Sequence, residues 1–260
     1  MKRNINVVKI GGNVVDNPEA LNDFLCQFAK MDGPKILVHG GGREATRLSA
    51  ALGIETTMIE GRRVTDAATL EVVTMVYAGL INKRIVAKLQ AFDCDAIGLS
   101  GADADVISAV KRKSEPVDYG YVGDISNDGV SENVIAMMLR NNLTPVFCAI
   151  IHDGNGELLN CNADTVAAAV AVSSSRLYPV TLTYCFEKPG VLADAEDETS
   201  LIPVIDSENI ESLKADGTLS GGMIPKVDNA FAAVKKGVKR VVIKSALQLC
   251  DESAGTTIRL

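Results

Sequence analysis

The chain has 260 residues, 47% of them hydrophobic, with no long uncharged apolar run, which predicts a globular protein without a membrane span. A net charge of −7 argues against nucleic acid as the main partner, because neutralising phosphates requires a basic face. Two histidines nearly exclude a histidine-rich metal site, and six scattered cysteines without a Cys-x-x-Cys pair indicate reduced thiols.

Apolar, β-branched runs alternate with longer segments of helical character along the chain. In chain order the expected elements are strand 5–10, helix 18–31, strand 36–39, helices 43–52 and 67–92, strands 106–110 and 145–151, helix 162–173, and strands 179–183 and 241–244. This alternation indicates an α/β fold around a largely parallel sheet that is covered on both faces. Ligands are then expected at the carboxyl ends of the strands.

Two further features concern the organisation of the chain. The glycine-punctuated aromatic segment 119–124 is expected to form a surface β-hairpin outside the central sheet. A soft domain boundary is expected at the serine run 173–175, which separates a larger N-terminal lobe from a smaller C-terminal one.

Three glycine-rich segments suggest anion binding. They are Lys-Ile-Gly-Gly at 9–12 after the first strand, His-Gly-Gly-Gly-Arg at 39–43 after the second, and Gly-Gly-Met-Ile-Pro-Lys at 221–226 at a helix start. Glycines allow a phosphate to approach the backbone, helix N-termini favour negative charge, and lysines add a mobile positive charge. The first segment lacks the spacing of a P-loop or a dinucleotide fingerprint, and taken singly each segment is also compatible with an ordinary turn or cap.

Two polar segments complete the set. Arg63 precedes a helix start that Thr65 or Asp66 can cap, and its planar guanidinium suits a carboxylate, although taken alone it is more often a solvated surface arginine. Asn160 and Asp164 flank another helix start, where a cap alone is the simpler reading. Together with the lysines and glycines these residues suit phosphoryl transfer, which requires mainly positioning and charge neutralisation. A carboxylate acceptor would need no general base, because it is already ionised near neutral pH.

With these motifs the chain resembles the amino acid kinase family, in particular its N-acylglutamate kinases, over almost its whole length. The matching segments are Lys-x-Gly-Gly at 9–12, His-Gly-Gly-Gly at 39–42, Gly-x-Arg-Val-Thr at 61–65, Tyr-Gly-Tyr-Val-Gly at 119–123, Asn-x-Asn-Ala-Asp at 160–164, Gly-Gly-Met-Ile-Pro-Lys at 221–226 and Gly-Thr-Thr-Ile at 255–258. The resemblance implies an open three-layer αβα sandwich with two lobes. Residues 1–173 would bind the N-acylated glutamate and form a dimer, and residues 174–260 would bind ATP with Mg²⁺. The implied reaction is phosphorylation of the γ-carboxylate, the second step of arginine biosynthesis.

The resemblance also implies roles for individual residues. Lys9 and Lys226 would stabilise the transferring phosphoryl group, and Asp164 would orient both lysines. The backbone N–H groups of Gly12, Gly41 and Gly42 would be donors. The acylglutamate would be held by Gly41, Gly42, Arg63 and Asn160, with Arg63 on the α-carboxylate. The expected nucleotide-binding residues are Gly11, Glu187, Lys188, Gly190, Leu192, Thr218, Ser220 and Gly222.

One segment departs from the family pattern. Where the family usually has Ser/Thr-Asp-Val-x-Gly, this chain has Phe186-Glu187-Lys188-Pro189-Gly190, with Glu187 in the place of the aspartate. A longer carboxylate could still serve there, and Lys188 could meet a phosphate or the ribose. No residue of the chain is expected to be a metal ligand.

The acyl group stays open between N-acetyl and N-succinyl, because Arg62, Arg43 and Lys83 could accommodate extra negative charge. A short segment before Lys9 leads us to expect a homodimer that arginine does not inhibit, and the absence of a secretory signal leads us to expect a cytoplasmic protein. The alternatives are a sister kinase that acts on carbamate, glutamate, aspartate or UMP, and a non-catalytic amino-acid-sensing protein.

Overall fold

The computed structural model describes residues 4–59, 61–194, 196–219 and 223–260. Its centre is an eight-stranded sheet with the strand order β12-β14-β13-β11-β1-β2-β8-β5. In this order the strands are Val204–Ile205, Thr256–Ile258, Arg240–Ser245, Val180–Phe186, Ile5–Ile10, Lys35–His39, Thr144–Cys148 and Ala96–Leu99. Among the described residues, β13 and β14 form the antiparallel pair and the other neighbours in the sheet are parallel. The prediction of a largely parallel sheet is therefore confirmed.

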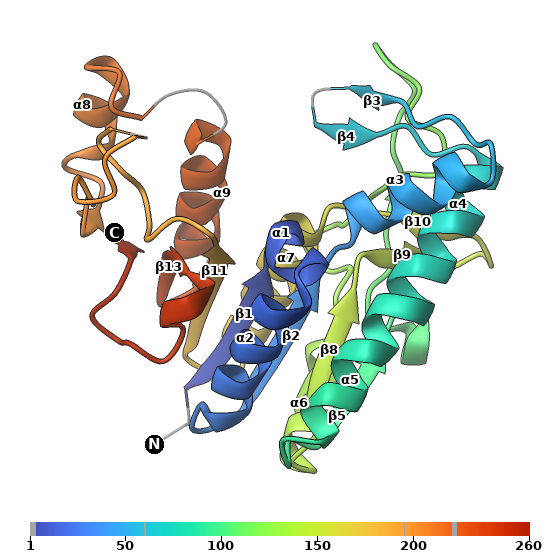
Figure 1. Ribbon diagram of the computed structural model, residues 1–260, viewed down its shortest axis with the longest axis horizontal. Coiled ribbons are helices and arrows are strands. Elements are labelled where there is room, and N and C mark those ends of the chain that lie inside the picture. The colour runs from blue at the N-terminus through green and yellow to red at the C-terminus, as the bar shows by residue number, and fades with distance from the viewer. Residues whose placement is uncertain (1–3, 60, 195, 220–222) are drawn as a thin grey trace.

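Helices cover both faces of this sheet (Figure 1). On one face α7 (Ala163–Ser175) lies against β1, β11 and β2, with α6 (Glu132–Arg140) beside it on β8 and α9 (Met223–Lys235) on β13. On the other face α5 (Asn82–Gln90) covers β5 and β8 and packs against α2 (Pro18–Lys30). The result is the three-layer αβα sandwich that the sequence predicted.

The smaller elements lie around the ends of the sheet. The helical ones are α1 (Gly12–Asp16), α3 (Gly42–Ala51), α4 (Ala67–Thr74), the π-helical η1 (Met75–Ile81), the 3₁₀ turns η2 (Asp103–Asp105) and η3 (Ala246–Gln248), and α8 (Ile210–Ala215). The two-stranded ribbons are β3 (Met58–Ile59) with β4 (Arg62–Arg63), β6 (Val110–Lys111) with β7 (Gly123–Asp124), and β9 (Ile150–His152) with β10 (Leu158–Asn160). In the described part of the chain, no helix has the length and hydropathy needed to span a bilayer.

Local sequence explains where α2 begins and which of its faces is buried. The side chain of Asn17 accepts hydrogen bonds from the backbone N–H groups of Glu19 and Ala20, and Pro18 occupies the first helical position. Apolar residues then recur at the helical period on the buried face, and they are Leu21, Phe24, Leu25 and Phe28. Burial of this face against the core fixes α2 beside α5.

Two expected elements differ from the structure. The run 106–110 was wrong as a central strand, because Val106 and Ile107 are buried in irregular backbone that is pinned by isolated bridges. The edge of the sheet is formed instead by β5, a short strand with a glycine in its middle. An apolar run reports burial, and burial alone does not distinguish a strand from a packed loop. The expected helix 67–92 exists as α4, η1 and α5 in succession.

Segment 119–124 lies outside the central sheet, as predicted, but it does not form a hairpin by itself. Gly120 bridges Thr65, Val122 bridges Asn160, and β7 pairs with β6, so its partners come from three distant segments. The segment therefore joins the ends of β4 and β10 instead of folding back on itself.

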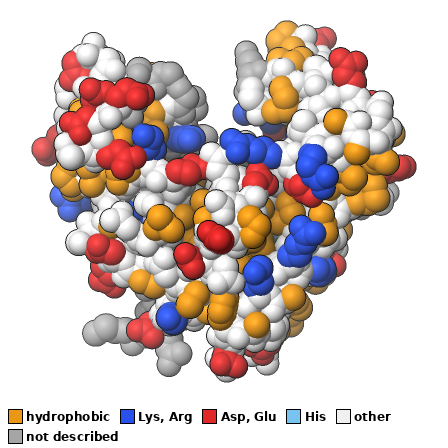
Figure 2. Space-filling view, viewed as in Figure 1, with side chains coloured by type: hydrophobic (Ala, Val, Ile, Leu, Met, Phe, Trp, Pro, Cys, Tyr) orange, Lys and Arg blue, Asp and Glu red, His pale blue; other side chains and the backbone are white. Residues whose placement is uncertain are grey.

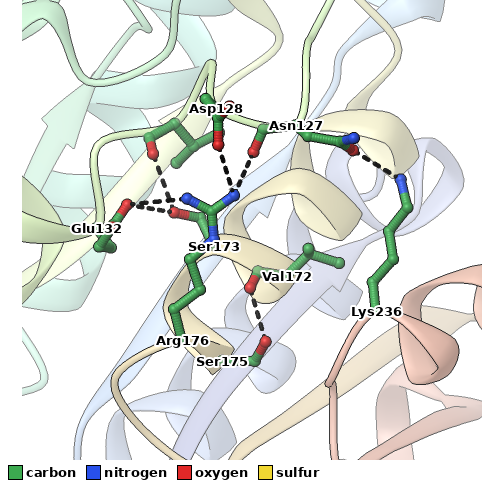
Figure 3. Close-up of polar contacts among 9 residues, drawn as sticks. Asn127, Asp128, Glu132, Val172, Ser173, Ser175, Arg176 and Lys236 are labelled. Carbon is green, nitrogen blue, oxygen red and sulfur yellow. Dashed lines mark hydrogen bonds and ion pairs between the residues drawn. The ribbon is translucent and has the colours of Figure 1, made fainter.

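A loop between β7 and α6 contacts the ends of α7 and α9, which cover the same face of the sheet (Figure 3). The side chain of Arg176, just after α7, donates from Nη2 to the backbone oxygen of Asn127 at 2.7 Å and to Oδ1 of Asp128 at 3.0 Å. Lys236, just after α9, donates from Nζ to Oδ1 of Asn127 at 3.0 Å. The same loop thus contacts the ends of α7 and α9.

Candidate functional site

A cavity of about 250 Å³ lies where β1 and β2 end and where α1, α3 and α7 begin. Seven of the eight residues predicted to act in catalysis or acceptor binding line it, namely Lys9, Gly12, Gly41, Gly42, Arg63, Asn160 and Asp164. These residues are spread over more than 150 positions of sequence, which shows how the carboxyl ends of parallel strands gather distant segments. Figure 2 shows the molecule hollowed between its two upper masses, with Lys and Arg side chains on the floor and walls of the hollow.

An ion pair lies at the inner end of the cavity. Lys9, on the second-to-last position of β1, is 7% exposed and has its Nζ 2.8 Å from Oδ1 of Asp164. Asp164 is held in the first turn of α7, where its backbone N–H donates to the capping side chain of Asn162 at 2.7 Å. Because a buried ammonium needs a partner, Asp164 fixes the direction in which Lys9 points.

The second predicted lysine, Lys226, contacts an aromatic ring. Lys226, near the start of α9, has its Nζ 4.2 Å from the ring centroid of Phe186. Lys9 contacts the same ring, at 5.0 Å from the centroid. The structure thus pairs Asp164 with Lys9 and gives Lys226 an aromatic neighbour, whereas the sequence led us to expect one carboxylate between the two lysines.

The predicted glycines differ in what surrounds them. A Cβ at Gly41 would overlap Cδ1 of Ile81 and lie 3.0 Å from Cδ1 of Tyr77, so any larger residue would have to displace side chains of η1. Gly12 opens α1 with nothing near the place of a Cβ, which leaves its backbone accessible. The N–H of Gly11 donates to the backbone oxygen of Cys185 at 2.9 Å and thereby belongs to the sheet.

Arg63 is buried beside the start of α3. Its Nη2 donates to the backbone oxygen of Gly42 at 2.8 Å and to Oγ1 of Thr46 at 2.9 Å, and its Nη1 donates to Oγ1 of Thr56 at 3.2 Å. A guanidinium has five N–H donors, so about two remain for a ligand in the cavity. The protein acceptors fix the plane of the guanidinium, which is what a bidentate carboxylate site requires.

Asn160 offers an acceptor to the same cavity. Its Nδ2 donates to Oγ1 of Thr65 at 3.0 Å, which fixes the orientation of the amide. Its Oδ1 is buried and lacks a hydrogen-bond partner among the described residues. A buried polar atom without a partner is costly, and a ligand N–H that entered the cavity would satisfy it.

Sequence reasoning missed part of the lining. Tyr77 and Arg112 line the cavity, as does Arg62, which was expected only as a possible source of extra charge. Burial raises the pKa of the Tyr77 phenol, and the neighbouring Arg63 opposes that rise. Arg112 is bound to the carboxylate of Asp124. Neither Tyr77 nor Arg112 belongs to a recognisable local motif, because the packing of η1 and of the β6–β7 ribbon brings them to the cavity.

Other predicted residues do not line this cavity. Lys83 donates from its Nζ to the backbone oxygen of Gly98 at 3.0 Å, and Arg43 is exposed on α3. His39 is fully buried, and burial lowers its pKa to about 4, so the ring is neutral. The Nδ1 of His39 donates to the backbone oxygen of Gly40 at 2.8 Å, and Nδ2 of Asn82 lies 3.1 Å from its Nε2. His39 is therefore a buried residue that helps to fix the backbone of the glycine segment.

Apart from Gly11, the residues expected to contact the nucleotide lie in the C-terminal part of the chain. Glu187 and Lys188 are exposed after β11, and Lys188 lies 3.4 Å from Oε1 of Glu198. A Cβ at Gly190 would come within 3.0 Å of the backbone nitrogen of Thr256, so the glycine permits close packing there. The others are Leu192, which bridges Leu201, and Thr218, whose N–H donates to Asp216, while Ser220 and Gly222 fall outside the described residues.

The comparison with known proteins decides the family. The profile of the amino acid kinase family matches residues 4–245. The chain belongs to the amino acid kinase family. An acetylglutamate kinase of Phocaeicola vulgatus is 50% identical, with 100% of both chains covered. An acetylglutamate kinase of Cytophaga hutchinsonii is 51% identical over 94% of this chain and 92% of that one.

A solved structure shows the same fold. The crystal structure of smu.665 from Streptococcus mutans UA159 is 28% identical and superimposes with a TM-score of 0.79, covering 98% of both chains. The resemblance that the motifs indicated is therefore confirmed, together with the fold that it implied. Membership of a kinase family makes ATP the phosphoryl donor.

Proposed function

We propose that this member of the family transfers the terminal phosphoryl group of ATP to the γ-carboxylate of an N-acylated L-glutamate, with N-acetyl-L-glutamate as the acceptor named for its relatives. The observation that carries the proposal is the single cavity in which Lys9, Arg63 and Asn160 converge. The fixed guanidinium and the unpartnered amide oxygen match an α-carboxylate and an acylamino N–H, and the ammonium matches the phosphoryl group that the γ-carboxylate receives. The reaction is the second step of arginine biosynthesis.

The charge of the cavity favours an acceptor with several carboxylates. Its lining includes Lys9 and three guanidinium groups, from Arg62, Arg63 and Arg112, against the carboxylate of Asp164. A cleft lined mainly by one sign of charge attracts ligands of the opposite sign. We therefore assign Arg63 to the α-carboxylate, Asn160 to the acylamino group, and the glycine N–H groups to the γ-carboxylate.

The chemical step needs positioning more than proton transfer. An oxygen of the γ-carboxylate attacks the γ-phosphorus, the bond to the β–γ bridging oxygen breaks, and ADP leaves with that electron pair. The carboxylate is ionised at neutral pH, so no base has to remove a proton. Lys9 and Lys226 would neutralise charge on the transferred group, and the N–H of Gly12 would donate to one of its oxygens.

We also propose that the two lobes divide the substrates. The predicted acceptor-binding residues all precede position 174, whereas Lys226 and the residues predicted to meet the nucleotide follow it, apart from Gly11. ATP would then lie against α9 and the end of β11, with its terminal phosphate between the lysines. The boundary falls within the last turn of α7, whose first turn carries Asp164.

ATP would enter as its Mg²⁺ complex. The described residues contain no group of three metal-ligating side chains, so phosphate oxygens and water would supply most ligands of the ion, as is usual for Mg²⁺ in kinases. When bound, the ion neutralises phosphate charge. The lysines and glycine N–H groups of this chain would contact the remaining phosphate oxygens.

The test measures the release of ADP in a coupled assay that contains Mg²⁺ and ATP. N-acetyl-L-glutamate, N-succinyl-L-glutamate and free L-glutamate are compared at equal concentrations, because Arg62 and Arg112 offer charge that a succinyl carboxylate could use. Turnover with an acylated substrate above that with free glutamate is the expected result. Turnover only with glutamate, carbamate, aspartate or UMP would favour a sister kinase, and no ATP binding by calorimetry would favour a sensor.

We further propose a homodimer. Met75 and Leu80 on η1 are exposed apolar side chains, and β5 ends the main sheet next to α5 with an open edge. Exposed apolar side chains and an open strand edge each favour association with another chain. Light scattering after gel filtration should give the mass of two chains, and Met75→Glu together with Leu80→Glu should give the mass of one.

We place the enzyme in the cytoplasm. It consumes ATP, and all six cysteines are free in the structure, as expected for a reducing compartment. Fractionation of the native cells followed by immunodetection should recover the chain with cytoplasmic enzymes.

A further inference from the structure

The aromatic ring of Phe186 contacts both proposed catalytic lysines. The ammonium of Lys226 lies 4.2 Å from the ring centroid and that of Lys9 lies 5.0 Å from it. Both distances are within the range of about 6 Å in which a cation is attracted by the negative face of a ring.

Strand register explains how Phe186 reaches Lys9. In the parallel pairing of β1 with β11, Lys9 stands opposite Tyr184, so their side chains share one face of the sheet. Phe186 follows two residues later on that face, and its ring stacks on Tyr184 with centroids 6.4 Å apart. The hydroxyl of Tyr184 donates to the backbone oxygen of Asp164 at 3.3 Å, which ties this aromatic pair to the first turn of α7.

The ring solves a problem that two convergent lysines create. Two ammonium groups directed at one phosphoryl group repel each other before the nucleotide arrives. A second carboxylate would hold Lys226, but it would also compete with the phosphate for the N–H donors. An aromatic face attracts an ammonium without accepting conventional hydrogen bonds, so the charge and the donors stay available.

We propose that Phe186 is a positioning residue, which holds the ammonium groups of Lys9 and Lys226 in place for the transferred phosphoryl group. This inference rests on the proposed kinase function. It assigns Phe186 an indirect role in the reaction, because this side chain acts on the substrate through the two lysines.

Kinetics of matched variants test the proposal. Phe186→Leu keeps an apolar side chain but loses the aromatic face, whereas Phe186→Tyr keeps the face. We expect kcat to fall about tenfold in Phe186→Leu, with the KM for the acylglutamate unchanged, and to stay within about twofold of the wild-type value in Phe186→Tyr. Replacement of Phe186 by trifluorophenylalanine, which has nearly the same shape but a weaker quadrupole, should lower kcat in the same direction.

A spectroscopic measurement tests the contact without turnover. In protein labelled with ¹³C at the lysine ε-carbons, the ring should move the ε-CH₂ proton signals of Lys9 and Lys226 upfield. The two signals are assigned by their loss in Lys9→Arg and Lys226→Arg. The shifts should persist in Phe186→Tyr and disappear in Phe186→Leu.

The outcomes separate this inference from the proposed function. Wild-type kcat in both Phe186→Leu and the trifluorophenylalanine protein would overturn the role of the ring, and so would ordinary lysine shifts in the wild type. Failure of the wild-type enzyme to phosphorylate any acylglutamate would overturn the proposed function instead, and the lysine shifts would still decide whether the contact exists.

Discussion

Asn127 accepts a hydrogen bond from Lys236 at 3.0 Å, and this contact joins the loop before α6 to the end of the helix that carries Lys226 (Figure 3). The same loop follows β7, whose Asp124 binds the cavity residue Arg112. The loop thus lies between the acceptor cavity and α9. Its contacts are candidates for setting how the two lobes are held together.

Removal of these contacts should lower the free energy of unfolding, and the loss should grow with the number of contacts removed. Lys236→Ala should lower the free energy of unfolding by less than about 1 kcal/mol, because one exposed hydrogen bond is lost. Arg176→Ala should lower it by about 1–2 kcal/mol, because this side chain contacts Asn127, Asp128 and Glu132. Urea unfolding measures both changes. Lys235→Ala, at an exposed site one residue away, is the control, and an equal loss there would show that the loop contacts add nothing.

Asp164→Asn should inactivate the enzyme while it leaves the fold intact. The amide keeps the shape of the side chain, and the backbone hydrogen bond from residue 164 to Asn162 remains. Without the negative charge, however, Lys9 loses the partner that directs its ammonium. We expect kcat to fall by about 100-fold, as for loss of one transition-state donor. The control is Asp128→Asn, an exposed carboxylate away from the cavity, and comparable rates in the two variants would contradict the role of Asp164.

The sequence predicted the layers well because they depend on local patterns. Near-continuous apolar runs marked β1, β2, β8, β11 and β13, and helical periodicity marked α2 and α7. Prediction failed where burial and secondary structure separate. The apolar run around Ile107 is buried without being a strand of the sheet, while β5 is short and contains Gly98, which a propensity argument disfavours.

Prediction of the site followed the same division. Glycine runs and charged residues at strand ends are visible in sequence, and the cavity gathers them at the carboxyl ends of the strands. Tyr77 and Arg112 were missed because packing alone brings them there. The ring contact of Phe186 with Lys226 was also out of reach, since it depends on where tertiary packing places the start of α9 relative to the end of β11.

Arg63→Lys should weaken binding of the acceptor selectively. A lysine cannot reproduce a fixed guanidinium that satisfies Gly42, Thr46 and Thr56 and still offers donors to a carboxylate. We expect the KM for the acylglutamate to rise about 100-fold, while the KM for ATP changes little. Initial rates with each substrate varied separately measure the two constants. Arg43→Lys, at an exposed site on α3, should behave as wild type, and a parallel rise in both KM values of Arg63→Lys would argue against acceptor binding.

Substitution of two glycines should have different effects on stability. In Gly41→Ala the new methyl group overlaps Ile81, so we expect a loss of about 1–3 kcal/mol from overpacking against η1. In Gly12→Ala the methyl group meets open space in the first position of α1, so the free energy of unfolding should stay the same or rise slightly. Urea unfolding of the two variants compares them directly. Equal stabilities would mean that η1 moves away from Gly41 at little cost.

His39 should make the stability of the protein depend on pH. Burial lowers its pKa to about 4 from the ordinary 6.5, so between these values the unfolded chain binds a proton that the folded chain does not. Stability from this group is therefore fully present above pH 6.5 and is lost as the pH falls toward 4, by about 3 kcal/mol in total. His39→Gln keeps a polar side chain that does not titrate. We expect the free energy of unfolding to fall by about 3 kcal/mol more in the wild type than in the variant between pH 7 and pH 4. Because the carboxylates titrate in both proteins, the difference between the two curves isolates His39, and parallel curves would show that the ring is accessible to protons in the folded state.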